Sequence, residues 1–228
     1  MTLPGHQPND EVNRTAYLKK HLWQKRRNEI ITYNDCLYRN IYDFKFIIPL
    51  DIDEVIIPVA KDTWAEMLDD YLREDRQALK RYASLAVRNA YFFKQYAKES
   101  VTTDNNLSEN IEPDDKIPSH LYMLKHTVRS SNFSRPGHSV KSFVLTNVTK
   151  TTFNHYAMHP LFMKTSITKN LPLSVAQMNH YKDKCPRDMY TKCKNTFLKY
   201  KTSDYIIMKY KDQLIAKTEH VLKEMNFV

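Results

Sequence analysis

Glycine is almost absent from this chain. Only Gly5 and Gly137 occur among its 228 residues, so neither the glycine-rich Walker loop nor the dinucleotide-binding fingerprint can be present. A phosphorylated ligand would therefore have to be held by basic side chains and a metal ion. The three cysteines include no CxxC pair, which argues against a zinc knuckle.

Long apolar runs are also lacking. No stretch of 18 apolar residues occurs, and the first ten residues are polar and contain two prolines. We therefore expect neither a membrane span nor a signal peptide within this sequence.

The composition is that of a packed globular protein. The chain is 42% hydrophobic and contains 2 Trp, 15 Tyr and 10 Phe, enough to build a core. Its formal net charge of +9 suits an anionic partner, whether nucleotide, nucleic acid or membrane surface. Because this charge is spread along the chain and no nucleic-acid-binding motif occurs, we expect no nucleic acid as a partner.

An acidic run interrupts the apolar stretch between residues 44 and 58. Asp51, Asp53 and Glu54 lie there between two β-branched segments, and burying three carboxylates is costly unless something neutralises them. In an extended chain Asp51 and Asp53 would project to one face and Glu54 to the other. Two carboxylates on one face can share a hard divalent cation. The alternative is a solvated turn that happens to be acidic.

The remaining pattern predicts alternating helices and strands. Thr63 and Glu66 fit a capping box at the start of a helix, and Pro136–Gly137 marks a turn. Residues 98–119 are polar and acidic, and we expect an exposed loop there, either a lid or a disordered segment. Helices are expected within residues 11–43 and 204–225, and strands at 83–93, 122–130, 139–145 and 152–158, with a further segment of unassigned type at 175–181.

Seven short blocks, in order between about residues 20 and 200, together resemble glycosyltransferase family 92. The blocks are Tyr33–Arg39, Asp51–Pro58, Val87–Phe93, Leu121–Leu124, Pro136–Lys141, Asn154–Tyr156 and Ala176–Lys182. The resemblance implies an α/β fold of the GT-A type with a mixed sheet, formed by residues 1–228 as a single domain. It also implies that family members carry a longer N-terminal portion, with a membrane anchor and nucleotide-binding strands, so we expect this chain to lack those strands.

The activity implied by the resemblance is the transfer of a hexose, galactose, from a nucleotide-sugar donor to a glycan acceptor. UDP-galactose would be the donor and a divalent metal, Mn²⁺, the cofactor. The implied location is the luminal side of a Golgi or secretory-pathway membrane, reached only through an N-terminal anchor that this sequence lacks. The alternative is an inactive, truncated remnant of such an enzyme that acts, if at all, as a binding module.

The family resemblance also assigns roles to three site residues. Asp51 and Asp53 would form the metal and donor motif, with Asp53 as the direct metal ligand and Asp51 nearer the donor's ribose. His180 would complete the metal site. From the residues alone, His180 could equally be a solvated histidine or one satisfied in the core.

Other candidates follow from residue chemistry. Arg88 and Lys141 could contact the donor's diphosphate, although such residues are more often surface charges or partners of a carboxylate. No catalytic base can be placed, and a disulfide between Cys36 and Cys185 is possible but not established by spacing. Further candidates for the site are Asn34, Asp35, Glu54 and His155.

Overall fold

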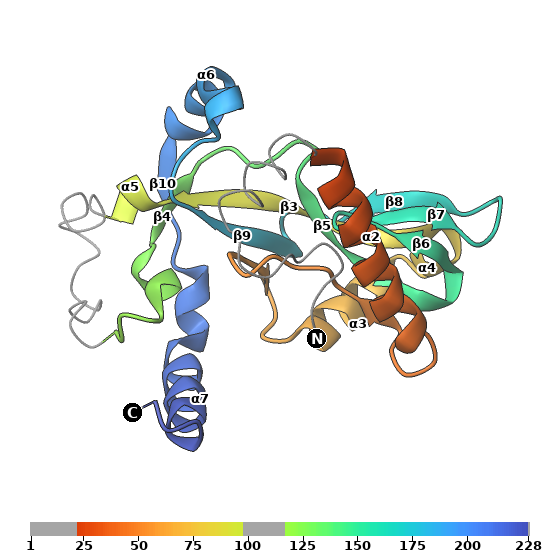
Figure 1. The fold of residues 1–228 in the computed structure, drawn as a ribbon, viewed down its shortest axis with the longest axis horizontal. Coiled ribbons are helices and arrows are strands. Elements are labelled where there is room, and N and C mark those ends of the chain that lie inside the picture. Colours follow the sequence, from red (N-terminus) through yellow and green to blue (C-terminus); the bar gives the residue numbers. More distant parts are fainter. Residues whose placement is uncertain (1–21, 98–116, 228) are drawn as a thin grey trace. The chain divides into compact units, whose positions relative to one another are not determined.

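The computed structural model describes residues 22–97 and 117–227, and Figure 1 shows them as alternating helices and strands. The fold is α/β with a mixed sheet, as predicted. Two compact units are present. The first contains residues 22–50, 75–86 and 141–170, and the second contains the other described residues. Within the described ranges, no helix is both long enough and apolar enough to cross a membrane. The acidic loop predicted for residues 98–119 lies almost entirely outside them.

The first unit begins with the predicted N-terminal helix. Its elements are α2 (Leu22–Arg39), β1 (Phe46–Ile47), α4 (Ala78–Arg81), the start of β3 (Tyr82–Phe93), β5 (Val140–Leu145), the 3₁₀-helix η4 (Thr146–Val148), β6 (Thr149–Thr152), β7 (Ala157–Pro160) and β8 (Ser166–Asn170). β1 pairs antiparallel with β5, and the first half of β3 pairs parallel with β8. The buried core of this unit contains Leu37, Ile47, Ala83, Val144 and Ala157.

Two of the predicted strands are wrong in part. Residues 153–156 form the bend between β6 and β7, where the Phe153 N–H donates to the Tyr156 carbonyl at 3.0 Å. Polar Asn154 and His155 occupy this bend, so the 152–158 segment is a hairpin connection with strands on either side. In the 122–130 segment, residues 122–125 form a 3₁₀-helix and only residues 128–130 are extended.

The second unit carries the acidic run and the C-terminal helix. Its elements are β2 (Glu54–Pro58), α3 (Trp64–Glu74), the second half of β3, α5 (Lys94–Ala97), η3 (Tyr122–Lys125), β4 (Val128–Ser130), β9 (Ala176–Lys182), η5 (Arg187–Met189), α6 (Tyr190–Cys193), the π-helix η6 (Lys194–Leu198), β10 (Lys201–Ser203), η7 (Ile206–Tyr210) and α7 (Lys211–Glu224). β9 lies between β3 and β2, parallel to the first and antiparallel to the second.

Alternation along β9 gives the sheet of this unit two different faces. On one, the histidine face, Glu54 lies opposite His180 and Tyr91 lies beside His180. On the other, the tyrosine face, Val55 packs with Phe92 and Tyr181. The candidate site lies on the histidine face.

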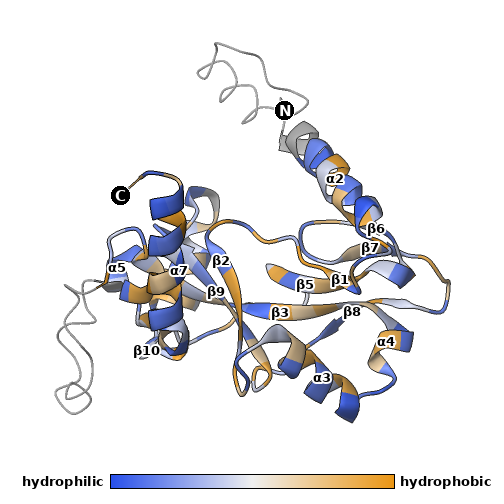
Figure 2. Cartoon of the chain, turned by 90° about the horizontal axis from the view of Figure 1, so that it is seen from below, coloured by the Kyte–Doolittle hydropathy of each residue, from blue (hydrophilic) through white to orange (hydrophobic). Residues whose placement is uncertain are grey.

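The helices of the second unit begin and pack as their sequences predict. Thr63 and Glu66 form the capping box of α3, because each side chain accepts the other residue's backbone N–H, at 3.1 and 3.2 Å. Met67, Leu68 and Tyr71 are the buried residues of this helix. α7 carries both hydrophobic and hydrophilic residues (Figure 2) and packs through its apolar side chains on Ile57 and Ile207.

The cysteine pairing differs from the one that was considered. Cys185 forms a disulfide with Cys193, eight residues later, and Cys36 is exposed and free. Sequence spacing alone does not determine which cysteines pair. The short connection through η5 and α6 brings Cys185 and Cys193 together. The disulfide belongs to a buried cluster with Phe93 and Tyr96.

Candidate functional site

The acidic run forms a turn, not the extended strand that was expected. The Glu54 N–H donates to the Asp51 carbonyl at 3.0 Å, and the strand begins only at Glu54. Asp51 and Ile52 are exposed, whereas the Glu54 side chain is only 3% exposed and faces His180. The prediction that Glu54 points away from the site is therefore wrong, because the chain turns before the alternation of the strand begins.

His180 lies between two carboxylates from this turn. Its Nε2 atom is 3.3 Å from Asp53 Oδ2, and its Nδ1 atom is 3.2 Å from Glu54 Oε1. Both ring nitrogens are buried, and within the described part of the chain neither forms a hydrogen bond of good geometry. The backbone fixes this arrangement, since the Tyr181 N–H donates to the Asp53 carbonyl at 2.9 Å and Glu54 pairs with His180 across the two strands.

The electrostatics of the cluster favour a neutral imidazole beside a charged carboxylate. Burial, reinforced by the positive charge of Lys182, lowers the pKa of His180 to about 4, although Asp53 opposes this shift. Burial acts to raise the pKa of Asp53, but the hydrogen bond from Lys182 and the attraction of nearby positive charge hold that pKa below its ordinary value. At neutral pH, His180 is therefore an electron-pair donor and Asp53 is an anion.

Three further residues, to which the sequence pattern assigns no role, belong to this cluster. Lys182 Nζ lies 3.1 Å from Asp53 Oδ2, and it could have been found because it is two residues after His180 on the same strand face. The Tyr91 ring lies 5.4 Å from the His180 ring and 4.6 Å from the Phe197 ring. No sequence signal identifies these two aromatic residues, because their positions depend on strand register and on the π-helix.

The two residues predicted to contact the diphosphate belong to different units. Arg88 belongs to the tyrosine face, where its Nε donates to the Ser134 carbonyl at 2.6 Å and its guanidinium lies over Phe133. Lys141 is buried in the first unit. Arg88 thus lies on the face of the sheet opposite the Asp53 cluster.

The remaining candidates lie in the first unit and have structural contacts. Asn34 Nδ2 donates to the Ile30 and Thr152 carbonyls, while its Oδ1 accepts the Thr152 N–H at 2.9 Å, so this side chain joins α2 to β6. Asp35 forms an exposed ion pair with Arg39 at 2.8 Å. The ring of His155 packs against Phe153 at 5.4 Å in the bend after β6.

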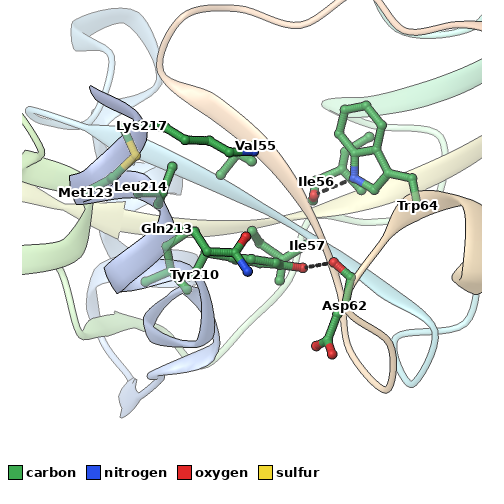
Figure 3. A pocket seen from close by; sticks show the side chains of 11 residues that line it. Val55, Ile56, Ile57, Asp62, Trp64, Met123, Tyr210, Gln213, Leu214 and Lys217 are labelled. Atoms are coloured by element: carbon green, nitrogen blue, oxygen red, sulfur yellow. Dashed lines mark hydrogen bonds between the residues drawn. The ribbon is translucent and has the colours of Figure 1, made fainter. Parts of the chain in front are cut away.

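A separate pocket of about 330 Å³ opens between β2 and α7 (Figure 3). Apolar side chains make up most of its wall, and Trp64 and Tyr210 lie at its sides, where they donate hydrogen bonds to the Ile56 and Asp62 carbonyls. Val55 and Ile57 face this pocket, so it lies on the side of β2 opposite Glu54 and His180. An apolar pocket on the tyrosine face cannot contribute to the Asp53 cluster.

The residues of the cluster fit a divalent metal. A carboxylate oxygen and a buried neutral imidazole nitrogen without a good hydrogen bond are suitable donors for Mn²⁺. Within residues 22–97 and 117–227, no three His, Cys, Asp or Glu side chains are grouped as a complete metal site. Asp53 and His180 would thus supply part of a ligand set, as in sites where substrate phosphates and water supply the rest.

Comparison with known proteins identifies the family. No curated protein matches this sequence. Residues 2–218, nearly the whole chain, match the sequence model of glycosyltransferase family 92. Seven sequence blocks, an α/β fold with a mixed sheet and this match agree, and the chain belongs to glycosyltransferase family 92.

Proposed function

We propose that this glycosyltransferase moves a hexose, galactose, from UDP-galactose to a glycan acceptor, with Mn²⁺ held by Asp53 and His180. The observation that carries the proposal is the neutral His180 placed 3.3 Å from Asp53 in a chain of this family. Asp51, which is exposed on the same turn, is in a position to contact the donor from the solvent side. When bound, the metal would stabilise negative charge on the leaving diphosphate.

Lys182 would assist the departure of the diphosphate. Its ammonium lies 3.1 Å from Asp53 Oδ2, and its side chain is 38% exposed, so it can reach a ligand without being pulled from a buried position. A fixed positive charge next to developing negative charge lowers the barrier to bond cleavage. Asp53 orients this ammonium, and His180 excludes water from the side of the sheet.

The aromatic residues beside His180 would form a wall of the donor site. Tyr91 and Phe197 are both half-buried, and the Asn89 amide donates to the Tyr91 hydroxyl at 3.4 Å. Aromatic rings of this kind present an apolar face and, in Tyr, a polar tip. They are suited to contact the apolar face of a sugar ring.

We further propose that the protein acts on the luminal side of the secretory pathway, in the Golgi. The disulfide between Cys185 and Cys193 supports this location, because such bonds persist in oxidising compartments. Mass spectrometry of the protein from secretory membranes would show this bond intact. Isolation of the chain with both thiols reduced would contradict the proposal.

Calorimetry and a transfer assay test the function. The wild-type chain should bind UDP-galactose only with Mn²⁺ present, and Asp53→Ala should weaken this binding about 100-fold, because a metal ligand is lost. Asp183→Ala is the matched control, since it removes an exposed carboxylate next to Lys182 and the same unit of charge. Equal affinity of Asp53→Ala and wild type would reject the metal assignment. Binding without transfer to any glycan would instead favour a binding module.

Lys182→Met tests the diphosphate contact separately. We expect the affinity for UDP to fall about 10-fold, the effect of one charge-assisted contact. Lys184→Met removes an exposed lysine two residues later and should leave this affinity unchanged. Similar losses of UDP affinity in the two variants would mean that the net charge of the protein, and not a contact with Lys182, controls UDP binding.

A further inference from the structure

Both carboxylate oxygens of Glu54 are engaged inside the protein. Its Oε1 atom is 3.2 Å from His180 Nδ1, and its Oε2 atom accepts the Asp51 N–H at 3.1 Å. The side chain is 3% exposed. Glu54 therefore contacts both halves of the candidate site, the Asp51–Asp53 turn and the imidazole on β9.

The register of the sheet imposes this contact. Glu54 and His180 are direct partners in the antiparallel pair of β2 and β9, and directly opposed side chains lie on the same face within reach of each other. The carboxylate thus meets Nδ1, while Nε2 is on the side of Asp53. The two nitrogens of one ring face two carboxylates with different exposures, 3% for Glu54 and 30% for Asp53.

We propose that Glu54 is a positioning residue that fixes the orientation and the tautomer of His180. Its carboxylate would accept a hydrogen bond from Nδ1–H, so the lone pair of Nε2 remains on the side of Asp53, where a ligand would be bound. Carboxylates commonly orient metal-binding histidines in this way through the far ring nitrogen. Contacts of this kind are often long or misaligned before the ligand binds and tighten afterwards, which agrees with the present 3.2 Å contact.

A role for Glu54 as the general base is less compatible with its surroundings. A base must reach the acceptor's hydroxyl proton, but this side chain is almost fully buried and bonded to the turn on one oxygen. Its engagement favours holding the site over proton transfer with an acceptor. The inference rests on the proposed function only for the identity of the ligand.

Nitrogen-15 NMR of the metal-free protein tests the inference directly. At pH 7 the wild-type His180 ring should carry its proton on Nδ1. Glu54→Gln should shift the ring toward the Nε2–H form, because the one amide oxygen would accept the Asp51 N–H and the amide nitrogen, a donor, would then face Nδ1. Glu66→Gln is the matched control, since Glu66 also accepts the N–H of the residue three positions earlier, at 3.1 Å, but has no histidine partner. It should leave the His180 signals unchanged.

The affinity for UDP-galactose and Mn²⁺ gives a second readout. Glu54→Gln should lower this affinity 10- to 100-fold, the usual effect of removing a group that orients a metal ligand. Glu66→Gln should leave the affinity unchanged. A wild-type ring protonated on Nε2 would overturn the inference even if Glu54→Gln fails to fold. If the wild type binds no UDP-galactose but carries its proton on Nδ1, the proposed donor is wrong and the role of Glu54 stands.

Discussion

The polar side chains on the two faces of β9 differ in how well their hydrogen-bonding atoms are satisfied. On the tyrosine face, Gln177, Asn179 and Tyr181 are joined by hydrogen bonds of 2.8 and 3.2 Å, and Gln177 also donates to Asp204. Asp204 further accepts from Arg129 at 2.6 Å and from the Ile206 N–H at 3.0 Å. On the histidine face, the ring nitrogens of His180 have close carboxylates but no well-formed hydrogen bond in the described part of the chain.

This difference in hydrogen bonding indicates a structural role for the tyrosine face and a ligand-binding role for the histidine face. Buried polar groups in proteins are normally satisfied, and each exception requires an explanation. A fully satisfied network rigidifies the fold, which is the role we assign to Asp204 and Arg129. A buried group without a well-formed hydrogen bond is suited to bind a ligand, which is the role we assign to His180 together with the partly exposed Asp53.

The largest expected effect on stability comes from removing a member of the hydrogen-bonded network on the tyrosine face. Asp204→Ala should lower the free energy of unfolding by about 3–5 kcal/mol, because it leaves the buried Arg129 charge unpaired. Asp53→Ala should cost less than about 1 kcal/mol, since the Asp53 side chain is 30% exposed and its partner Lys182 can reach water. Urea unfolding of both variants measures the difference. Equal losses would remove the distinction between the faces.

Acidification should destabilise the histidine face next. The folded pKa of His180 is about 4, below its ordinary value of 6.5, so the unfolded chain takes up a proton between these pH values while the folded chain does not. The contribution of His180 to the free energy of unfolding is therefore fully present above pH 6.5, and it falls by about 3 kcal/mol as the pH drops to 4.

Comparison with His180→Gln isolates this contribution from the other histidines. The variant's free energy of unfolding should decline less steeply over the same pH range, as measured by urea titrations at several pH values. Parallel curves for variant and wild type would show that His180 is not held in a neutral state.

Removing the disulfide should have a somewhat smaller effect on stability. Cys185→Ser opens a loop of eight residues, which corresponds to about 2–3 kcal/mol from chain entropy. Since Cys185 and Cys193 pack in the cluster that holds Tyr91 and Phe197, the variant should also bind UDP-galactose more weakly. Cys36→Ser, which changes an exposed free thiol, is the control and should change neither property.

The smallest expected effect on stability comes from a residue that lies on neither face of β9. Thr63→Ala removes the capping box of α3 and should cost about 1 kcal/mol of unfolding free energy. Donor affinity should remain at the wild-type value, because the cap contacts neither Asp53 nor His180. A loss of donor affinity in this variant would indicate that stability alone controls binding.

Much of the fold could be predicted from local patterns. The strand predicted at residues 83–93, the capping box and the C-terminal helix are present as expected, because each depends on residues close in sequence. The segment at residues 175–181, whose type was not predicted, forms β9. The prediction of a strand through Asp51 was wrong, since a turn stabilised by Glu54 replaces it. Alternation predicts faces only after the start of a strand is known.

The site could be predicted only in part, for a similar reason. The sequence paired Asp53 with His180 through the family resemblance, and the structure places them 3.3 Å apart. Residue chemistry suggested Arg88 and Lys141, but strand alternation places Arg88 on the opposite face of the sheet, and Lys141 is buried in the first unit. The contribution of Glu54 depends on its register with His180, which no local pattern reveals.

The central claim is that the two faces have separable roles, and one paired measurement tests it most directly. Unfolding free energy and affinity for UDP-galactose with Mn²⁺ should be determined together for His180→Gln and Gln177→Ala. We predict that His180→Gln loses at least about 10-fold in affinity with little change in stability. Gln177→Ala should lose about 1 kcal/mol of stability and keep its affinity. Loss of affinity in proportion to stability in both variants would contradict the account.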